Sequence, residues 1–585
     1  MKKVIRRIYR RIKKSKRART VFSVAVAGFI AIIIIATALL VLRAKSAKTL
    51  SIAISGEPET LDPAYASCPD YSTVNVLAFE GLMKFDENGN PQKAVASSYT
   101  VSGDGLTYSF TLGNSIWSNG ERVTSEDFAF AWERAADSER NPEYAYLFDN
   151  IDRIEVKAET EETEENEETE ENEEAEEEKE EEVEEEEEEN SEEAVETETK
   201  LNLVTTDSAV LTVHLKKPDS GFLSKCAMSV FSPVCKKVVA ANTRIWGYTP
   251  DSFVSNGEYV LSQWQRDSYL VLTKNEKYSG EMPEKTPDNI KVYFAPDGES
   301  AVSLFKDSTV LYSSAVSEEA CEKYRNKSYF FSQPDYGTYY IMFNQGVKPF
   351  NDKNVRLALS LAIDREELAE SLGEWNFEPA DKILSPAFKT PDGNSLSDSL
   401  KTNINLSDSD ENIKKAKELL ASAGYPEGKG FPAFTYMYND NTYHQTVARC
   451  IIKMWKENLG IACEEKPLPY SKFNDNRQYS NFTAVRDGVI CPNGDTLPLV
   501  SKFTSENDIS SWKNPQYDSL FSTLNTTADI SSRFDLTAQC CDILLENEVC
   551  CPLLWYKNCY LASGKLKNYY VLPDGTAYFN AVKIR

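Results

Sequence analysis

The order of apolar and polar residues predicts a mixture of strands and helices. Between positions 106 and 112 the two kinds alternate, which is the period of a half-buried strand. Ser118-Asn119-Gly120 predicts a tight turn, because glycine adopts backbone angles that other residues avoid. Thr124 and Asp127, three positions apart, then predict a capped helix start. The stretch from 102 to 135 therefore predicts a strand, a turn and a helix.

The same pattern of short strands and amphipathic helices continues downstream. Residues 259–261 and 269–273 predict strands, and residues 412–423 and 444–459 predict helices that end at Gly424 and Gly460. A chain of 585 residues exceeds what one hydrophobic core usually supports. We therefore expect α/β lobes with a ligand site in the cleft between them.

The first 42 residues have the pattern of a membrane-targeting segment. Eleven Lys or Arg lie in residues 1–20, and residues 21–42 are uncharged and mostly aliphatic. Twenty-two residues at helical rise span about 30 Å of hydrocarbon, which favours an uncleaved single-pass anchor with a basic cytoplasmic tail. A long cleavable signal, cut near residues 44–47, is the alternative and would give a secreted or periplasmic protein.

The net charge of −28 is distributed very unevenly. Residues 1–48 contain fourteen Lys or Arg and no acidic residue, whereas residues 158–199 contain twenty-seven Glu and one Lys. We expect the Glu-rich segment to be a disordered loop inserted between strands, because it cannot bury apolar surface. The remainder is moderately acidic, which argues against nucleic-acid binding.

The cysteines and histidines give little sign of a metal or cofactor site. Twelve Cys would allow disulfides, such as Cys226 with Cys235 or the 540–541 pair with the 550–551 pair, although free buried thiols are the favoured interpretation. The sequence has no C-x-x-C motif and only two His, far apart, so we expect neither a metal nor a cofactor.

Several motifs, in the expected order, resemble one protein family. The stretch from 102 to 135 is similar to the signature region of the family 5 extracellular solute-binding proteins, the oligopeptide- and dipeptide-binding receptors of ABC importers. The resemblance extends from residue 52 to about residue 560. Its other motifs are ETLDP at 59–63, NGEY at 256–259, PFND at 349–352, VRLAL at 355–359, AIDR at 362–365 and WKENLG at 455–460.

The resemblance implies a periplasmic-binding-protein-like α/β fold with two lobes, a strand hinge and an extra inserted domain. It also implies that most signature residues are structural. Carried over to this chain, lobe I takes residues 49–79, 216–337 and 555–585, the inserted domain takes 80–215, and lobe II takes 338–554.

The resemblance also implies where a ligand binds. In the peptide-binding members a strand-like segment pairs with the peptide backbone, which points here to Gly488, Val489 and Ile490. The ligand carboxylate is expected at Arg486, with Arg477 and His444 as further candidates. Tyr144 and Tyr146 lie near a tyrosine that contacts the peptide backbone in relatives.

One departure leaves the ligand open. Pro492 occupies the position of the aspartate that binds the peptide amine in relatives, and Asp487 or Asp495 could replace that aspartate. Val489 replaces a tryptophan that commonly lines a side-chain pocket in the family.

The resemblance predicts a binding protein that acts as a monomer and captures an oligopeptide, or a related small solute, for a membrane permease. A membrane-tethered receptor for a peptide signal is the alternative within this fold. An enzyme, such as a hydrolase with paired carboxylates, is disfavoured because the sequence contains no G-x-S-x-G, H-E-x-x-H or Walker motif.

Overall fold

The computed structural model describes residues 48–65, 68–141, 144–157, 197–283, 286–491, 494–527 and 529–585. The predicted tail and anchor at 1–42, residues 158–196 of the Glu-rich segment, and Pro492 lie outside the described residues. No helix within the described ranges has the length and apolar character needed to cross a membrane. The last residues of the expected Glu-rich loop, 197–199, belong to strand β7 (Thr197–Leu201), which pairs with β6 (Arg153–Lys157).

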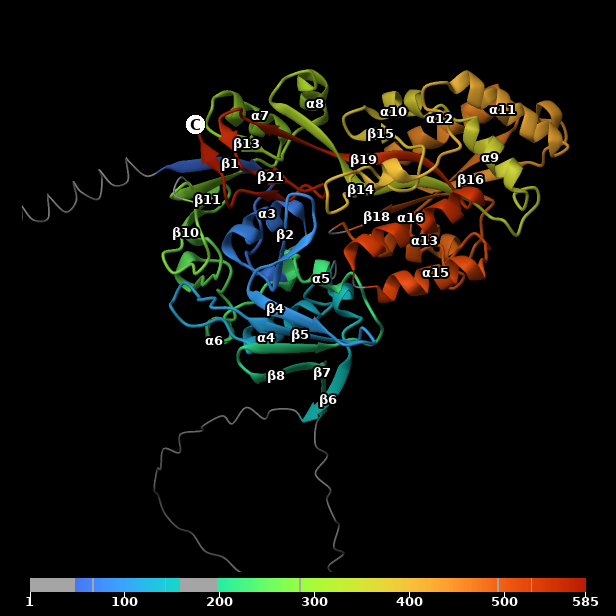
Figure 1. Cartoon of the computed structure of the whole chain (residues 1–585). Coiled ribbons are helices and arrows are strands. Elements are labelled where there is room, and N and C mark those ends of the chain that lie inside the picture. Colours follow the sequence, from blue (N-terminus) through green and yellow to red (C-terminus); the bar gives the residue numbers. More distant parts are fainter. Residues whose placement is uncertain are drawn as a thin grey trace, which may run out of the picture.

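A single sheet runs through both lobes (Figure 1). Its strand order is β10-β11-β12-β1-β13-β19-β14-β18-β16-β17, and β15 (Phe377–Pro379) pairs with β19 beside this path. The strands of the first lobe are β1 (Thr49–Ile54), β10 (Tyr259–Gln265), β11 (Tyr269–Lys274), β12 (Asn289–Phe294) and β13 (Tyr312–Ser313). Those of the second are β16 (Phe434–Asn439), β17 (Cys463–Leu468) and β18 (Ala484–Ile490).

Two long antiparallel strands join the lobes, β14 (Phe330–Phe343) and β19 (Cys550–Ala562). The end of β19 pairs with β13 in the first lobe, and the second half of β14 pairs with β18 in the second lobe. The β14–β19 pairing shifts register between Pro334 and Thr338, so Asp335, Tyr336 and Gly337 lie at the crossing between the lobes. The boundaries predicted from the resemblance, at 337/338 and 554/555, fall within these two strands.

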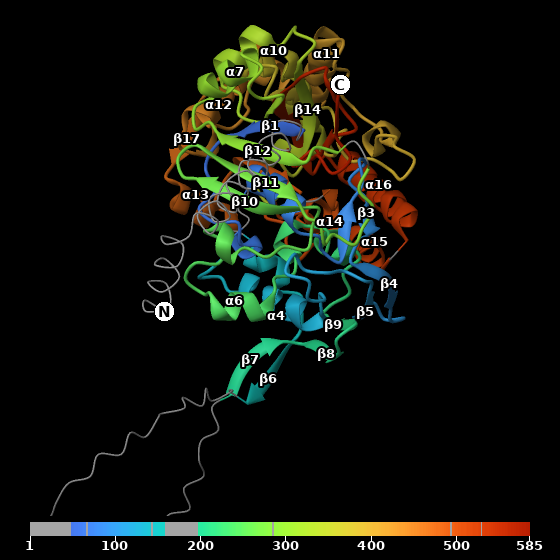
Figure 2. The same cartoon turned by 90° about the vertical axis from the view of Figure 1, so that its left-hand side faces the viewer.

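The region predicted as an inserted domain packs directly against the first lobe (Figures 1 and 2). Its sheet orders β4 (Ala96–Val101), β5 (Thr107–Leu112), β9 (Val210–His214) and β8 (Leu203–Asp207), next to helix α4 (Ser125–Ala135). The strand, the turn and the capped helix expected between 102 and 135 are confirmed. The Thr124 N–H donates to Asp127 Oδ2 at 2.9 Å, and Gly120 has a φ of 96°. One continuous apolar core includes Phe110 and Trp132 of this region together with Ile52 and Val292 of the first lobe.

The second lobe is a sheet covered by helices on both faces. Alternation along β14 sends Tyr339 and Ile341 into one core and Tyr340 and Met342 into the other. The helices that contribute to the first core are α9 (Lys353–Leu361), α10 (Arg365–Leu372), α11 (Ser409–Ser422) and α12 (Thr442–Leu459). Those of the second are α13 (Tyr470–Gln478), α14 (Leu497–Ser501), α15 (Pro515–Thr526) and α16 (Ile530–Glu546).

The remaining short elements complete the first lobe. They are α3 (Pro69–Ala78), α5 (Phe222–Lys225), α6 (Lys236–Ala241), α7 (Gly298–Lys306), α8 (Glu318–Tyr324), β2 (Met83–Phe85), β3 (Pro91–Lys93), and four C-terminal strands: β20 (Leu566–Lys567), β21 (Tyr570–Val571), β22 (Ala577–Tyr578) and β23 (Lys583–Ile584).

Signature residues mostly hold the scaffold together, as the resemblance implied. Asp352 and Asp364 cap α9 and α10 through backbone amides. The Trp117 indole is fully buried and donates to Asp127 Oδ2 at 3.1 Å. Arg356 is buried and donates to the carbonyls of Phe350, Asn547 and Glu548.

The disulfides considered from the sequence do not form. Cys226 and Cys235 are buried free thiols, as are Cys540, Cys541, Cys550 and Cys551. The favoured interpretation of buried thiols that pack like small apolar side chains therefore holds for these six residues.

Arg365 gives a direct test of how the second lobe is held to the hinge strands. Its guanidinium is 2% exposed and donates to the carbonyls of Ala380, Pro552, Ser360 and Ile363 at 2.9–3.0 Å. Arg365→Met leaves these acceptors unsatisfied and should lower the free energy of unfolding by about 3–5 kcal/mol. Urea unfolding followed by tryptophan fluorescence measures the loss.

The matched control for Arg365 is Arg449→Met. Arg449 is an exposed arginine whose ion pair with Glu465 spans 3.2 Å, so its replacement should change the unfolding free energy by no more than about 0.5 kcal/mol. Equal effects of the two substitutions would contradict the role assigned to Arg365.

Candidate functional site

Two cavities lie between the lobes and meet at Ile490, the last residue of β18. The first has a volume of about 310 Å³ and is lined by α3, by the C-terminal strands, by Asp335 of β14, and by Ile490 and Cys491. The second, of about 360 Å³, lies between Tyr146 and Lys225 on one side and Asp495 and Ser501 on the other. The Ile490 side chain is 60% exposed, so the end of β18 projects into the space between the lobes.

Within the described part of the chain, one edge of β18 has no neighbouring strand over most of its length. On its other edge β18 pairs with β14 along all seven residues, whereas β16 reaches only Ala484 and Val485. The Cys491 N–H donates to the Tyr336 carbonyl across the β14 edge. Because backbone directions alternate along a strand, the N–H and C=O groups of Arg486, Gly488 and Ile490 face the open edge.

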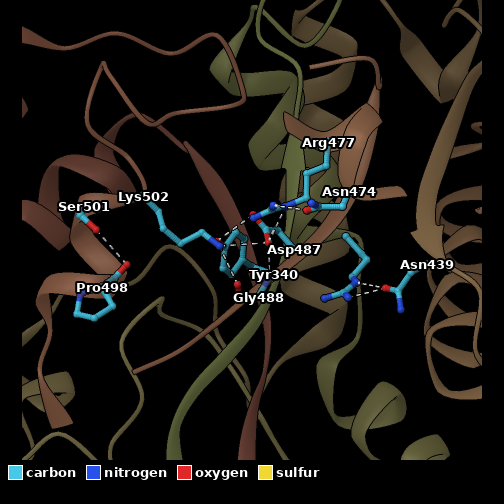
Figure 3. Close-up of polar contacts among 10 residues, drawn as sticks. Tyr340, Asn439, Asn474, Arg477, Asp487, Gly488, Pro498, Ser501 and Lys502 are labelled. Atoms are coloured by element: carbon cyan, nitrogen blue, oxygen red, sulfur yellow. Dashed lines mark hydrogen bonds and ion pairs between the residues drawn. The ribbon is translucent and has the colours of Figure 1, made fainter. Parts of the chain in front are cut away.

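The backbone groups of Gly488 on this edge contact side chains of the same chain (Figure 3). Its N–H donates to Asp487 Oδ1 at 2.8 Å, and its carbonyl accepts from Lys502 Nζ at 2.8 Å. A Cβ at position 488 would lie 3.3 Å from the Tyr556 hydroxyl, so glycine leaves space that a side chain would fill. The edge is therefore polar, and it lies close to two charged groups.

Arg486 carries a positive charge with no acidic partner among the described residues. Its Nε donates to Asn439 Oδ1 at 2.8 Å, and the guanidinium lies 5.1 Å from the centre of the Phe473 ring. Both partners are neutral. The charge of Arg486 is therefore not compensated by an acidic side chain of the described residues.

His444 lies in the first turn of α12, with only 8% of its surface exposed. Its Nδ1 atom is buried and has no hydrogen-bond partner within the described part of the chain. Burial, together with the nearby Arg486 charge, lowers the pKa of His444 to about 4. The imidazole is therefore neutral at pH 7.

Arg477 differs from Arg486 because it forms an ion pair with an acidic side chain. Arg477 Nε lies 3.2 Å from Asp487 Oδ1, and Lys502 Nζ lies 3.3 Å from the same oxygen (Figure 3). Asp487 is 4% exposed and also accepts from the Tyr340 hydroxyl at 3.3 Å. The charge of Arg477 is thus compensated within the chain, unlike that of Arg486.

Neither aspartate considered as a replacement at position 492 is available to an external amine. Asp487 is held by Arg477 and Lys502. Asp495 is 5% exposed and pairs with Arg533 at 2.8 Å.

The tyrosines and Val489 lie in three different environments. Tyr144 lines the first cavity, while Tyr146, 55% exposed, lines the second. The Val489 side chain is 7% exposed and packs in the core of the second lobe, and its backbone pairs with Thr338 of β14. Alternation therefore turns the Val489 side chain away from the face of Arg486 and Gly488, and a ligand contact at Val489 stays a prediction.

Sequence reasoning missed three polar residues at the site: Lys502, Asp335 and Asp574. Lys502 gives no local signal, because only the fold brings it to Gly488. Asp335 did give one, since it is a single acidic residue within the long, largely apolar strand 330–343. Asp574 belongs to a Pro-Asp-Gly turn, which suggests only a turn.

Close contacts also connect the lobes beside the second cavity. The Ser220 N–H donates to the Asn525 carbonyl at 3.2 Å, and its hydroxyl donates to the Leu524 carbonyl at 3.1 Å. A Cβ at Gly221 would lie 1.9 Å from Asp495 Oδ2. The loop that contains Ser220 and Gly221 therefore touches the second lobe directly.

Comparison with known proteins places this architecture in a family. Residues 90–511 match the bacterial extracellular solute-binding proteins, family 5 Middle. The chain is 25% identical to the dipeptide-binding protein DppE of Bacillus subtilis over 533 residues, or 90% of each chain. It is 24% identical to the oligopeptide-binding protein OppA of the same organism, over 92% of each chain.

The structure shows the same relationship. It superposes on the unliganded open form of the periplasmic murein tripeptide-binding protein MppA with a TM-score of 0.75 and 26% identity, covering 92% of this chain and 98% of that chain. The match of residues 90–511 spans more than half of the sequence. The chain therefore belongs to the bacterial extracellular solute-binding proteins of family 5.

Proposed function

We propose that this chain captures short peptides between its two lobes, outside the cytoplasm, and delivers them to the permease of an ABC importer. The observation that carries the proposal is the open edge of β18, which carries the uncompensated charge of Arg486 and reaches the interlobe cavities at Ile490. An extended peptide can add to such an edge through main-chain hydrogen bonds that do not depend on its side chains. Similarity to a dipeptide-binding and an oligopeptide-binding protein supports this ligand class.

In this proposal Arg486 binds the carboxylate of the peptide. A guanidinium held by a neutral amide and stacked near an aromatic ring is oriented without being neutralised. Neutral His444 lies beside it and adds no second positive charge. Arg477, bound to Asp487, contributes less.

The proposal places the folded lobes on the extracytoplasmic face, with residues 21–42 as a single-pass anchor and 1–20 in the cytoplasm. Intact-mass measurement on the membrane-extracted protein tests the anchor. A mass that includes residue 1 supports it, and a mass that begins near residue 47 shows that a signal was cleaved.

Arg486→Gln tests the carboxylate site. Isothermal titration with alanine peptides of two to five residues should show at least about tenfold weaker binding, because a charge-assisted hydrogen bond contributes about 1.5–3 kcal/mol. Amidated forms of the same peptides should bind the wild type and the variant equally. Arg477→Gln is the control and should have the smaller effect. Unchanged affinity of Arg486→Gln for the free peptides rules out this assignment.

His444 should make the protein less stable in acid. Its pKa in the folded state, about 4, lies below the usual unfolded value of about 6.5, so the unfolded state binds the proton more strongly. Stability is therefore lost as the pH falls below about 6.5. Relative to His444→Gln, the wild type should lose about 2 kcal/mol more between pH 7 and pH 4.5. Parallel pH profiles of the two proteins in urea unfolding would refute the buried neutral state.

Gly221→Ala should hinder the approach of the lobes. The added methyl would overlap Asp495, which Arg533 holds in place. Peptide affinity should fall about fivefold or more, and small-angle scattering should give a larger radius of gyration. Gly564→Ala, where a Cβ meets no atom within 4 Å, is the control and should behave like the wild type. Scattering curves that superpose for the two variants would show that this contact does not limit closure.

A further inference from the structure

The first interlobe cavity contains two carboxylates and, among its described lining residues, neither Lys nor Arg. Asp335 comes from the crossing strand β14, and Asp574 comes from the tip of the hairpin formed by β21 and β22. No cationic side chain of the described residues lies within ion-pair distance of either. The two acids belong to different parts of the chain and face the same cavity.

Local hydrogen bonds satisfy only part of each carboxylate. Asp335 Oδ1 accepts from the Tyr336 N–H at 2.5 Å, and the Asn558 side chain also hydrogen-bonds to the Asp335 carboxyl group. The Asp574 oxygens accept from the Thr576 N–H at 2.8 Å and the Thr576 hydroxyl at 3.2 Å. An ionised carboxylate offers about four acceptor positions, so both acids can accept further donors from the cavity.

A third polar residue in the cavity wall is Tyr578. Tyr578 lines the cavity with 6% of its surface exposed, and its ring stacks on that of Tyr570 with 4.8 Å between the ring centres. The Tyr578 side chain thus adds a hydroxyl to the same cavity wall as the two carboxylates.

A cation in the cavity would favour the ionised form of both carboxyl groups. Burial raises the pKa of Asp335 to about 7, with a smaller contribution from Asp574, and burial raises the pKa of Asp574 as well. Two neighbouring buried carboxylates are costly to ionise together unless a positive charge lies between or beside them. Within the described residues no group of three or more His, Cys, Asp or Glu could hold a metal ion, so an organic cation fits better than a metal.

We infer that Asp335, Asp574 and Tyr578 form a binding site for a primary ammonium group of the transported solute. This inference rests on the proposed function and deepens it. The ammonium can come from the amino terminus of a peptide or from a lysine side chain, and both present three donors to the acceptors of the cavity.

The position of the site also predicts the length and direction of the ligand. Arg486 and Ile490 are four residues apart on β18, which is about 13 Å at the rise of a strand. A peptide with its carboxylate at Arg486 and its ammonium in the cavity beyond Ile490 must run antiparallel to β18. An extended chain of about four residues spans this distance.

The test uses the full chain and three probes at pH 7.5: tetra-alanine, N-acetyl-tetra-alanine, and N-acetyl-Ala-Lys-Ala-Ala. The variants are Asp335→Asn and Asp574→Asn, which preserve shape and remove charge, with the exposed Asp392→Asn as control. Isothermal titration should show tetra-alanine binding weakened tenfold or more in both site variants and unchanged in Asp392→Asn. Acetylation should weaken binding to the wild type by a similar factor and should cost the site variants little. Recovery of affinity by the lysine probe identifies the side chain as a second source of the ammonium.

Two outcomes would overturn the inference while leaving peptide binding intact. In the first, acetylation weakens wild-type binding but both Asn variants bind tetra-alanine like the wild type, which places the ammonium elsewhere. In the second, acetylation has no effect on the wild type. Melting temperatures of the variants, measured alongside, show that they are folded.

A separate arm covers the case in which the wild type binds no peptide. Butylammonium should then raise the melting temperature of the wild type and leave that of the Asn variants unchanged, with butanol as the uncharged control. That result would support the cation site and contradict the proposal that the protein binds peptides. If butylammonium does not change the melting temperature of the wild type, both the cation site and the peptide proposal are contradicted.

Discussion

The antiparallel pairing of β14 with β19 is the constraint on which the rest of the structure depends. These two strands are the part of the sheet that continues from one lobe into the other, so they fix which surfaces can face each other. Their register shift between Pro334 and Thr338 lies at the crossing and turns Asp335 toward the first cavity. The same β14 strand holds one edge of β18 and leaves the other open. A hinge made of two strands can bend while its ladder keeps the lobes in register, which suits a protein that closes around a ligand.

Positive and negative side chains lie mainly at opposite ends of the cleft. This separation of charge would fix the direction in which a zwitterionic ligand binds. Three positive side chains, Arg486, Arg477 and Lys502, lie around β18 in the second lobe, and Arg477 and Lys502 share one negative partner, Asp487. The acids without a cationic partner, Asp335 and Asp574, lie at the hinge and in the first lobe. A zwitterionic ligand that bridges the lobes would satisfy both ends at once. Closure would then be favoured by binding itself, because neither lobe alone can supply both charges.

Features that depend on neighbouring residues could be predicted from the sequence. Features that depend on residues far apart in the sequence could not. The capping pair at Thr124 and Asp127 and the turn at Gly120 depend on neighbouring residues only, so pattern was enough. Arg486 and the β18 segment were identified through motif resemblance, because the residues of one strand are neighbours in the sequence and can be matched as one motif. Lys502, Asp335 and Asp574 come from segments up to about 240 residues apart, and only the tertiary fold brings them to one cleft. The period of two along a strand places the Val489 side chain on the face opposite Arg486, in the core of the second lobe.

Native mass spectrometry of the full chain, purified without added ligand and then dissociated to release what it holds, tests the central claim most directly. The account predicts a population of short peptides of mixed sequence, centred on about four residues, each with a free amino group and a free carboxylate. A single homogeneous non-peptide species, or peptides with blocked ends bound equally well, would contradict it.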